Sequence, residues 1–366
     1  MDYKKVLGTV NGLRRGFTSG TCAQATAKAA AMALTEQRTV ETIEVILPAM
    51  TLDLPVFEIS RNTTSACYGI FKDSGDDTDI TNGKEFRAEV SISEEPGITI
   101  VGGEGVGRVT REGLPVPPGE SAINPGPVRR ILSELKPFIP EKGGLSVVLS
   151  VPEGEVLASQ TWNPRLGITG GISIIGSSGI IEPKSSRAYK SSIALNVRVV
   201  RKSGADSIYL LSGYVGEKYT AKNGIAESQS ILFGDYVGFA LDKAVAQNFK
   251  EIILCAHIGK MAKVSAGMFN THCKYGDARL ETIAAHAALV GADRETVEAL
   301  MESVTAEAAS KIIREKGLKA VFDSLNRRLI ERSLLYMKKA IPLRSIILDL
   351  SGEVLSDISS REVSND

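Results

Sequence analysis

Two short apolar segments that end in glycine constrain the second half of this chain most strongly. They are 207–213, SIYLLSG, and 251–259, EIILCAHIG, and the segment between them, 228–249, is typical of a helical crossover. A strand, a crossover and a second strand form the parallel α/β unit, whose ligands collect beyond the carboxyl ends of the strands. We therefore predict a Rossmann-like, mostly parallel sheet in an α/β domain, residues 186–366. The other elements expected there are helices over 185–202 and 278–340 and a late strand, 344–352.

The first half of the chain shows a different pattern, in which short alternating or β-branched segments follow an alanine-rich helix. The segments expected as strands are 42–49, 65–73, 85–93, 97–110, 144–151 and 168–176. A proline-rich connection and a short helix, 128–138, divide them. This mixture predicts an α+β domain, residues 1–185. The length of 366 residues also favours two domains over one.

Charge and hydropathy argue against several kinds of partner. Lysine plus arginine and aspartate plus glutamate both number 43, so the chain has no overall attraction to nucleic acid or acidic membranes. The start, MDYKKVLGTV, lacks the apolar core of a signal peptide, and no stretch approaches the roughly 18 apolar residues of a membrane helix. We expect a soluble cytoplasmic protein with no nucleic-acid or membrane partner.

The four cysteines are scattered along the chain. Cys22, Cys67, Cys255 and Cys273 contain no Cys-x-x-Cys pair, which argues against a zinc site and against a secreted disulfide framework. We expect free thiols and no metal site.

A helix start is indicated by the segment FTSGTCAQ, residues 17–24. Thr21 and Gln24 have the Thr-x-x-Gln spacing of a capping box, in which the two side chains satisfy each other's backbone amides. Alternatively, the free amides around Ser19 to Thr21 and the positive end of the helix dipole receive a carboxylate or phosphate of a ligand. The stretch alone favours the plain cap.

Two glycine-rich loops resemble phosphate-binding motifs, but their residue patterns do not match those motifs. GGISIIGSS has the glycines of a P-loop, but Ser177 stands where lysine is needed. In GGEGVGR, Arg108 replaces the last glycine of a dinucleotide fingerprint. There remain Gly213, Gly216 and Gly259 at the ends of apolar strands, where the backbone can approach a ligand or simply turn tightly.

Two polar segments attract attention. KDSGDDTDITNG, residues 72–83, lacks the residue order of a calcium loop, so we interpret it as a solvated turn. HIGKMAKVSAGMFNTHCKYGDARLE, residues 257–281, follows a buried strand and combines glycines, two histidines and several cations. Its lysines and arginine are suited to substrate carboxylates. His286, on an alanine-rich helix, is more typical of a core or helix-surface histidine.

Five segments together resemble one family, the CbiD proteins of anaerobic cobalamin biosynthesis. They are RRGFTSGTCAQATAKAA, KDSGDDTDITNG, GVGRVTREGLPVPPGESAINPGPVRR, WNPRLGITGGISIIGSSGIIEPKS and HIGKMAKVSAGMFNTHCKYGDARLE, in this order between residues 14 and 281. The resemblance implies transfer of a methyl group from S-adenosylmethionine to C-1 of cobalt-precorrin-5B, giving cobalt-precorrin-6A. Cobalt enters only as part of the substrate, an anionic tetrapyrrole. Further partners expected from the resemblance are other corrin-pathway enzymes or, in a homo-oligomer, further copies of this chain.

Roles for individual residues follow from the resemblance together with the clusters above. The residues expected to be catalytic are His257, Lys260 and His272. The donor is expected around Ser212, Gly213, Gly216 and Asp235, after the parallel strands. The residues expected to bind the substrate are Thr18, Ser19, Gly20, Thr21, Lys263, Asn270, Thr271 and Arg279.

The implied reaction needs no activated serine or cysteine, because the electron-rich ring carbon is itself the nucleophile. The protein has to align the reactants and exclude water. Cys22 is then expected to be a small residue packed in the first turn of its helix. A corrinoid carrier without chemistry and a phosphate-utilising enzyme remain as alternatives, which binding of S-adenosylmethionine or ATP would distinguish.

Overall fold

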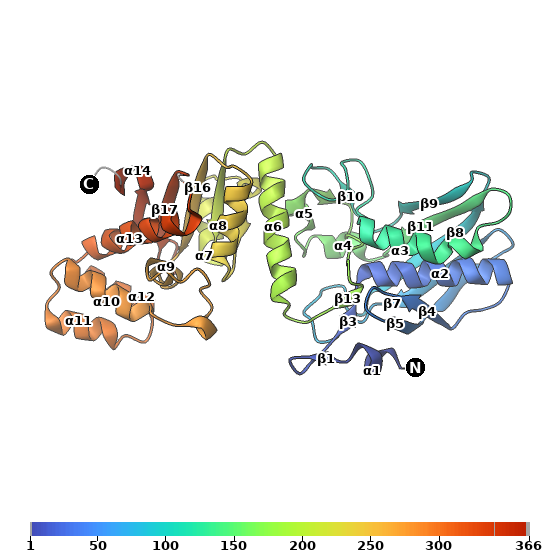
Figure 1. The fold of residues 1–366 in the computed structure, drawn as a ribbon, viewed down its shortest axis with the longest axis horizontal. Coiled ribbons are helices and arrows are strands. Elements are labelled where there is room, and N and C mark those ends of the chain that lie inside the picture. The colour runs from blue at the N-terminus through green and yellow to red at the C-terminus, as the bar shows by residue number, and fades with distance from the viewer. Residues whose placement is uncertain (1, 340, 364–366) are drawn as a thin grey trace. The chain divides into compact units, whose positions relative to one another are not determined.

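The computed structural model describes residues 2–339 and 341–363, and it divides into two compact units, Met1–Ser186 and Arg187–Asp366 (Figure 1). These are the N-terminal unit and the C-terminal unit. Both mix helices with β-sheet, in agreement with the α/β character expected from the sequence. Among the described residues, no helix is both long enough and apolar enough to cross a membrane.

The N-terminal unit is built on a five-stranded sheet in the order β6-β7-β8-β11-β9. Strands β9 and β11 are parallel, and the other neighbouring pairs are antiparallel. The strands are β6 Phe57–Arg61, β7 Ser65–Phe71, β8 Glu85–Ser93, β9 Gly97–Gly102 and β11 Gly144–Ser150.

Helix α2 (Ser19–Glu36) packs on β7 and β8 and against α3 (Pro125–Leu135) (Figure 1). Its alanines, including Ala27 and Ala31, are fully buried. Alanine favours the helix and adds little bulk, so the sheet and α3 can approach α2 closely. Large residues on the strands, such as Tyr68 and Phe86, complete the core beneath it.

Shorter elements complete the N-terminal unit. They are α1 Tyr3–Leu7, β1 Thr9–Val10, β2 Leu13–Arg14, β3 Gly16–Phe17, β4 Thr42–Ile46, β5 Thr51–Pro55, β10 Arg108–Val109, η1 Lys136–Phe138, α4 Gly154–Ala158, α5 Asn163–Leu166, β12 Ile168–Thr169 and β13 Ile180–Ile181. The strands predicted over 97–110 and 168–176 were too long. Gly105 explains the first break, because its φ of 67° and its tight approach to the Val151 carbonyl suit only glycine.

The C-terminal unit contains a five-stranded sheet in the order β15-β14-β16-β17-β18. The first four strands are parallel, and β18 is antiparallel to β17. The strands are β14 Ser207–Leu211, β15 Ser230–Leu232, β16 Glu251–His257, β17 Leu343–Leu348 and β18 Val354–Ser359. The helices are α6 Ser186–Lys202, α7 Tyr214–Lys222, η2 Glu227–Gln229, α8 Val237–Ala246, α9 Ile258–Ser265, η3 Cys273–Tyr275, α10 Arg279–Leu289, α11 Arg294–Met301, α12 Ala306–Glu315, α13 Ala320–Met337 and α14 Ser360–Val363.

Two strands of this sheet were not predicted. Strand β15 lies inside the segment interpreted as a helical crossover, and its three residues are too few to show a period of their own. Strand β18 returns beside β17 after a turn at Gly352, which has a φ of 89°.

The chain order within the sheet locates a candidate ligand site. From β14 the chain moves to β15 on one side and then returns to β16 on the other. In doubly wound sheets such a reversal marks the place, outside the carboxyl ends of the strands, where ligands bind. In the C-terminal unit this place lies between the ends of β14 and β16.

Candidate active site at the carboxyl edge of the C-terminal sheet

The four parallel strands end at one edge of the sheet, here called the carboxyl edge. Gly213 follows β14, Asp235 follows β15, His257 ends β16 and Asp349 follows β17. Parallel strands point the same way, so residues that are distant in the sequence meet at this edge. The register supports this arrangement directly, because Leu211 pairs with Leu232 and the Phe233 amide donates to the Leu211 carbonyl at 2.8 Å.

Gly213 gives this edge an open backbone. Its φ is 155°, and no described atom lies within 4 Å of the position that a Cβ atom would take. Glycine is therefore required by the backbone conformation and not by crowding. Ser212 and Gly213 are both partly exposed, so a ligand can approach the peptide between β14 and α7.

Gly216, predicted beside Gly213 as a donor contact, has a different environment. A Cβ atom there would lie 3.0 Å from Leu211 Cβ and 3.1 Å from the Cys255 carbonyl oxygen. The residue is buried, and its lack of a side chain lets α7 pack closely on β14 and β16. The geometry supports a packing role for Gly216.

Asp235, Lys260 and Thr271 form a compact polar cluster beside the end of β15. Lys260 Nζ lies 3.1 Å from Asp235 Oδ1 and donates to the Gly234 carbonyl at 2.7 Å. Thr271 Oγ1 donates to the same Oδ1 at 3.1 Å, and the Thr271 amide donates to the Asp235 carbonyl at 2.9 Å. Burial raises the pKa of Asp235, but the Lys260 charge and the hydrogen bonds outweigh it, so the net shift is downward. Asp235 is therefore a carboxylate at neutral pH.

Lys263, predicted to bind substrate, points into the protein. Its side chain is 5% exposed, and Nζ donates to the carbonyls of Thr271 at 3.0 Å and Gly276 at 3.2 Å. These bonds close the loop 268–277 over α9. A buried ammonium that satisfies two carbonyl groups fixes the shape of that loop.

His257, predicted as catalytic, is engaged at both ring nitrogens. Nδ1 accepts the Gly259 amide at 3.1 Å, which caps α9, and Nε2 lies 3.0 Å from Glu307 Oε2. This pattern fits a neutral ring that carries its proton on Nε2 and donates it to Glu307. In this geometry neither nitrogen is available to take a proton from a substrate.

Three charged residues that the sequence did not indicate extend this network. Glu307 also accepts the Leu350 amide at 3.1 Å. Arg314 lies 3.9 Å from Glu307 and donates to Asp349 at 3.0 Å. Asp349 is 3% exposed and holds the turn between β17 and β18. Asp349 lay inside the strand predicted over 344–352, and a strand that ends at Leu348 would have placed its carboxylate at the strand end. Glu307 and Arg314 lie on an ordinary amphipathic helix, α12, which gives no such signal.

The remaining predicted residues of the segment 257–281 lie on or beside the loop 268–277. His272 is exposed, and its Nδ1 accepts the Lys274 amide at 3.1 Å. It lies close enough to Asp235 to affect the pKa of that carboxyl group. Asn270 accepts the His272 amide at 3.2 Å. Arg279 is paired with Asp277 through a bond from Nε of 2.7 Å.

The start of α2 corrects two sequence interpretations. Thr18, and not Thr21, is the N-cap, and its Oγ1 accepts the Thr21 amide at 3.3 Å. The predicted Thr21–Gln24 capping box is wrong, because Gln24 instead bonds Ile46 and Glu134. Thr21 Oγ1 donates to the Gly179 carbonyl at 2.7 Å.

Several amides at this helix start already have partners. The Gly20 amide donates to the Ile175 carbonyl at 2.9 Å, while Ser19 Oγ accepts the Ile175 amide. Thr18, Ser19 and Thr21 are each at most 8% exposed. An anion site at a helix start needs amides that are not already bonded. Here the amides of Thr18, Gly20 and Thr21 each donate within the protein, so this helix start offers fewer free donors than the sequence suggested.

The acidic segment 72–83 is not the solvated turn that its composition suggested. Lys72 is 2% exposed and pairs with Asp79 at 2.6 Å. Asp73 pairs with Arg14 at 2.6 Å, and Asp76 accepts the Arg14 amide at the same distance. The segment therefore anchors the N-terminal residues of the chain.

Cys22 and His286 lie away from the carboxyl edge, and both are buried in the protein core. All four cysteines are free, and burial raises the pKa of Cys22 to about 12 despite its helix-start position. His286 is 8% exposed and lies 2.8 Å from Ser324 Oγ, as expected for a core histidine. Among the described residues, no three His, Cys, Asp or Glu side chains are grouped to hold a metal ion.

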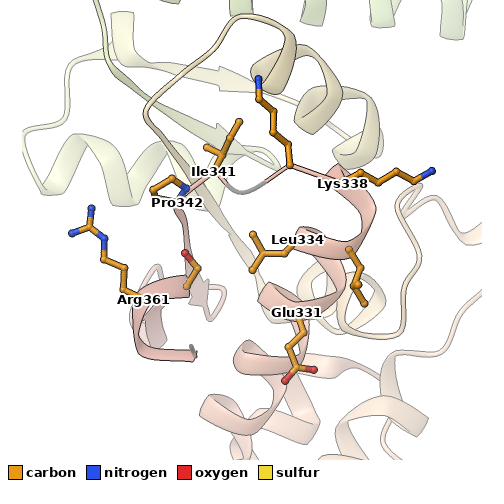
Figure 2. A pocket seen from close by; sticks show the side chains of 9 residues that line it. Glu331, Leu334, Lys338, Ile341, Pro342 and Arg361 are labelled. Carbon is orange, nitrogen blue, oxygen red and sulfur yellow. The ribbon is translucent and has the colours of Figure 1, made fainter. Parts of the chain in front are cut away.

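A cavity of about 770 Å³ lies away from this cluster, and it is lined by the end of α13, the segment after it and α14 (Figure 2). Leu334, Ile341 and Pro342 form its apolar wall, while Lys338 and Arg361 extend away from Leu334 (Figure 2). Pro342 directly precedes β17. The cavity is therefore at the edge where the parallel strands begin, opposite the carboxyl edge.

Known proteins of one family match this chain over nearly its whole length. The family model CbiD matches residues 7–183, and the model CbiD, C-terminal domain, matches residues 270–358. The curated proteins that match include several named cobalt-precorrin-5B C(1)-methyltransferase, among them proteins from the following three organisms. The one from Thermoanaerobacter sp. (strain X514) is 44% identical and covers 84% of each chain. Those from Alkaliphilus metalliredigens and Moorella thermoacetica are 38% identical, covering 95% and 98% of this chain and 93% and 98% of their own.

One solved structure also matches. A cobalamin biosynthesis protein (cbiD) from Archaeoglobus fulgidus is 27% identical, with 83% of this chain and 85% of that chain covered and a TM-score of 0.38. That score is too low for a comparison of the folds. The family matches and the extended identity to the three curated relatives nevertheless show that the chain belongs to the CbiD family.

Proposed function

We propose that this chain catalyses the reaction for which its relatives are named, methylation of C-1 of cobalt-precorrin-5B, with S-adenosylmethionine as donor and cobalt-precorrin-6A as product. The observation that carries this proposal is identity of 38–44% to cobalt-precorrin-5B C(1)-methyltransferases over 84–98% of the chain. Cobalt belongs to the substrate. The reaction is a step of anaerobic corrin-ring synthesis.

The donor site that we propose is the carboxyl edge of the C-terminal sheet. Gly213 supports it with a partly exposed backbone and with open space at the position that a Cβ atom would take. Asp235 supports it with a partly exposed carboxylate just after the neighbouring strand, β15. These features fit a small polar ligand that carries hydroxyl and amino groups. We infer that this edge serves as a Rossmann-like donor platform.

In this reaction the main task of the protein is to align the donor methyl group with the ring carbon. Bound S-adenosylmethionine supplies a methyl group already activated by its sulfonium, and the electron-rich ring carbon attacks it. The residues at the carboxyl edge bind, orient and shield the reactants from water. We propose that His257, with both nitrogens engaged, holds the start of α9 in place and does not exchange protons with substrate.

The substrate carboxylates need cations that face solvent. Lys274 is exposed on the loop 268–277, and no ion pair joins its ammonium to another described residue. Arg279 and Lys260 are partly exposed, although each is paired with an aspartate. We propose that Lys274, which the sequence did not single out, meets a substrate carboxylate together with Arg279, Asn270 and His272. The α2 start and Lys263 are not part of this proposal.

The proposed activity also suggests a cellular location and partners. We propose that the protein works in the cytoplasm, where it receives a corrin-pathway intermediate and passes its product to another enzyme of that pathway. A homo-oligomer is the simplest further assembly, and size-exclusion chromatography with light scattering tests it.

One set of titrations tests the proposed function against its alternatives. We expect calorimetric binding of S-adenosylmethionine and S-adenosylhomocysteine, no binding of ATP, and transfer of an isotope-labelled methyl group to cobalt-precorrin-5B. A corrinoid carrier would bind the tetrapyrrole without the donor. A phosphate-utilising enzyme would bind ATP. Either result, or transfer to a ring position other than C-1, contradicts the proposal.

A further inference from the structure

Asp235 stands in a particular relation to the open glycine at the carboxyl edge. Gly213 follows the first strand of the C-terminal unit, and Asp235 follows the second, which is its neighbour in the sheet. The two residues are roughly 20 positions apart. In nucleotide-binding α/β folds, an acidic residue at this distance from the glycine turn accepts hydrogen bonds from the ribose hydroxyls.

Only one oxygen of the Asp235 carboxylate has partners within the protein. Its Oδ1 accepts from Lys260 Nζ and Thr271 Oγ1, both at 3.1 Å. No hydrogen bond joins Oδ2 to any residue within 2–339 or 341–363, and the side chain is 33% exposed. One oxygen is thus fixed by the protein, whereas the other has no hydrogen-bond partner among the described residues in a side chain that is one-third exposed.

We propose that Asp235 Oδ2 accepts hydrogen bonds from the ribose hydroxyls of the bound adenosyl donor, and that Lys260 and Thr271 are positioning residues that hold this carboxylate by its other oxygen. This assignment rests on the proposed function, because it gives a contact within the donor site. It assigns Lys260 to the donor side, whereas the sequence suggested a catalytic role.

The charge balance of the cluster favours a neutral ligand group over a cationic one. The ammonium of Lys260 already compensates the Asp235 carboxylate at 3.1 Å. A second ammonium, such as the α-amino group of the donor, would lie close to Lys260 and be repelled by it. Hydroxyl groups meet no such repulsion and can use the unoccupied oxygen. The ribose is therefore the better match to Oδ2 than the amino acid end of the donor.

Binding of S-adenosylhomocysteine by calorimetry is the first test. We expect Asp235→Asn to weaken binding by about tenfold to a hundredfold, because a hydrogen bond to a charged acceptor is lost. Asp206→Asn is the matched control, since Asp206 forms an exposed pair with Lys250 at 2.7 Å just before β14, at the opposite edge of the sheet. It should bind like the wild type.

Changes in the ligand separate the two ends of the donor without altering the protein. Methylthioadenosine keeps the ribose and lacks the amino acid, so the Asp235→Asn penalty should persist with it. The 2′-deoxy analogue of S-adenosylhomocysteine should bind the wild type more weakly and show a much smaller penalty on Asp235→Asn. A penalty that vanishes with methylthioadenosine, or an unchanged affinity for the 2′-deoxy analogue, overturns the ribose assignment.

The positioning role of Lys260 has its own readout. Lys260→Met should weaken binding of S-adenosylhomocysteine less than Asp235→Asn does and add almost nothing in the Asp235→Asn background, as expected for coupled residues. Lys260→Arg should restore most of the affinity. Full additivity of the two substitutions contradicts the positioning role.

Failure of the inference is distinguishable from failure of the proposed function. If wild-type protein binds S-adenosylhomocysteine and Asp235→Asn binds it equally well, only the ribose assignment is wrong. If the wild type binds neither S-adenosylmethionine nor S-adenosylhomocysteine, the donor site itself is wrong and the proposed function fails with it.

Discussion

The start of α2 and the carboxyl edge of the C-terminal sheet look alike in sequence, since both place small or hydroxyl residues where a helix begins. In the structure they differ in what their polar groups contact. At α2, the Gly20 amide, Ser19 and Thr21 are satisfied by the segment 175–179 and are buried. At the carboxyl edge, Gly213 faces open space and Asp235 keeps one oxygen unoccupied. A helix start is a ligand site only if no distant part of the chain satisfies it first.

The largest expected effect concerns the buried cation of the N-terminal unit. Lys72→Met leaves the Asp79 carboxylate without the partner that compensates it at 2.6 Å. We expect the free energy of unfolding to fall by about 3 kcal/mol, as for a buried pair that loses one member. Chemical denaturation measures it. Lys84→Met, which breaks an exposed pair with Glu153, is the control and should cost less than about 1 kcal/mol. Equal losses would show that the segment 72–83 is a solvated turn after all.

The same pair makes stability depend on pH. Burial raises the pKa of Asp79, but Lys72 and the hydrogen bonds of Thr81 lower it by a larger amount. The pKa of Asp79 is therefore lower in the folded protein than in the unfolded chain. Its stabilising contribution is therefore complete above the ordinary carboxyl range and is lost as the pH falls through that range toward the folded pKa. Wild type should lose more stability than Lys72→Met between neutral pH and acid. Parallel pH profiles for the two proteins would contradict this.

The next effect compares two lysines on one helix of the C-terminal unit. Lys263→Met leaves two carbonyl groups of the loop 268–277 without their buried donor, so we expect a loss of about 2 kcal/mol and faster proteolysis of that loop. Lys260→Met breaks a pair that is one-third exposed and should cost less than about 1 kcal/mol while lowering donor affinity. Reversal of these two patterns would exchange the roles assigned to the lysines.

A smaller effect tests the closed state of the α2 start. Thr18→Ala removes the N-cap oxygen and should cost about 1 kcal/mol of stability, with no change in affinity for S-adenosylhomocysteine. Thr18→Ser keeps the oxygen and should lose much less. Weaker donor or substrate binding by Thr18→Ala at unchanged fold would return this helix start to the candidate site.

Some features could be predicted from the sequence because they depend on local pattern. The apolar segments ending at Leu211 and His257 form strands, and a helix does start beside Ser19. The capping box failed because Gln24 finds partners at Ile46 and Glu134, which no local spacing indicates. Strand β15 was missed because three residues carry no detectable period.

The candidate site shows the same limit. The sequence brought attention to Asp235 and Lys260, but their pairing depends on the order of strands in the sheet. Glu307 and Arg314 join the network around His257 through helix packing alone. Burial of Lys263 is equally invisible in a segment rich in exposed lysines and arginines. Residue type can be read locally, whereas exposure and partners are set by contacts between distant segments.

The smallest expected effect is at Cys22, the thiol placed at the start of α2. A helix N-terminus ordinarily favours a thiolate, but complete burial raises the pKa of this thiol to about 12. Iodoacetamide at pH 8 should therefore modify the exposed Cys273 and leave Cys22 unmodified, as peptide mass spectrometry would show. Denatured protein, in which all four cysteines should react, is the control.

Turnover gives the matching functional result. Cys22→Ser should keep most of the methyl transfer, because the ring carbon attacks the sulfonium methyl directly and a serine hydroxyl can bond within the first turn of the helix. A single direct displacement inverts the configuration of a chiral methyl group, whereas transfer through a methylated cysteine would retain it. Rapid alkylation of Cys22, or retained configuration together with loss of turnover in a folded Cys22→Ser protein, would open the α2 start as a chemical site and remove the contrast with the carboxyl edge.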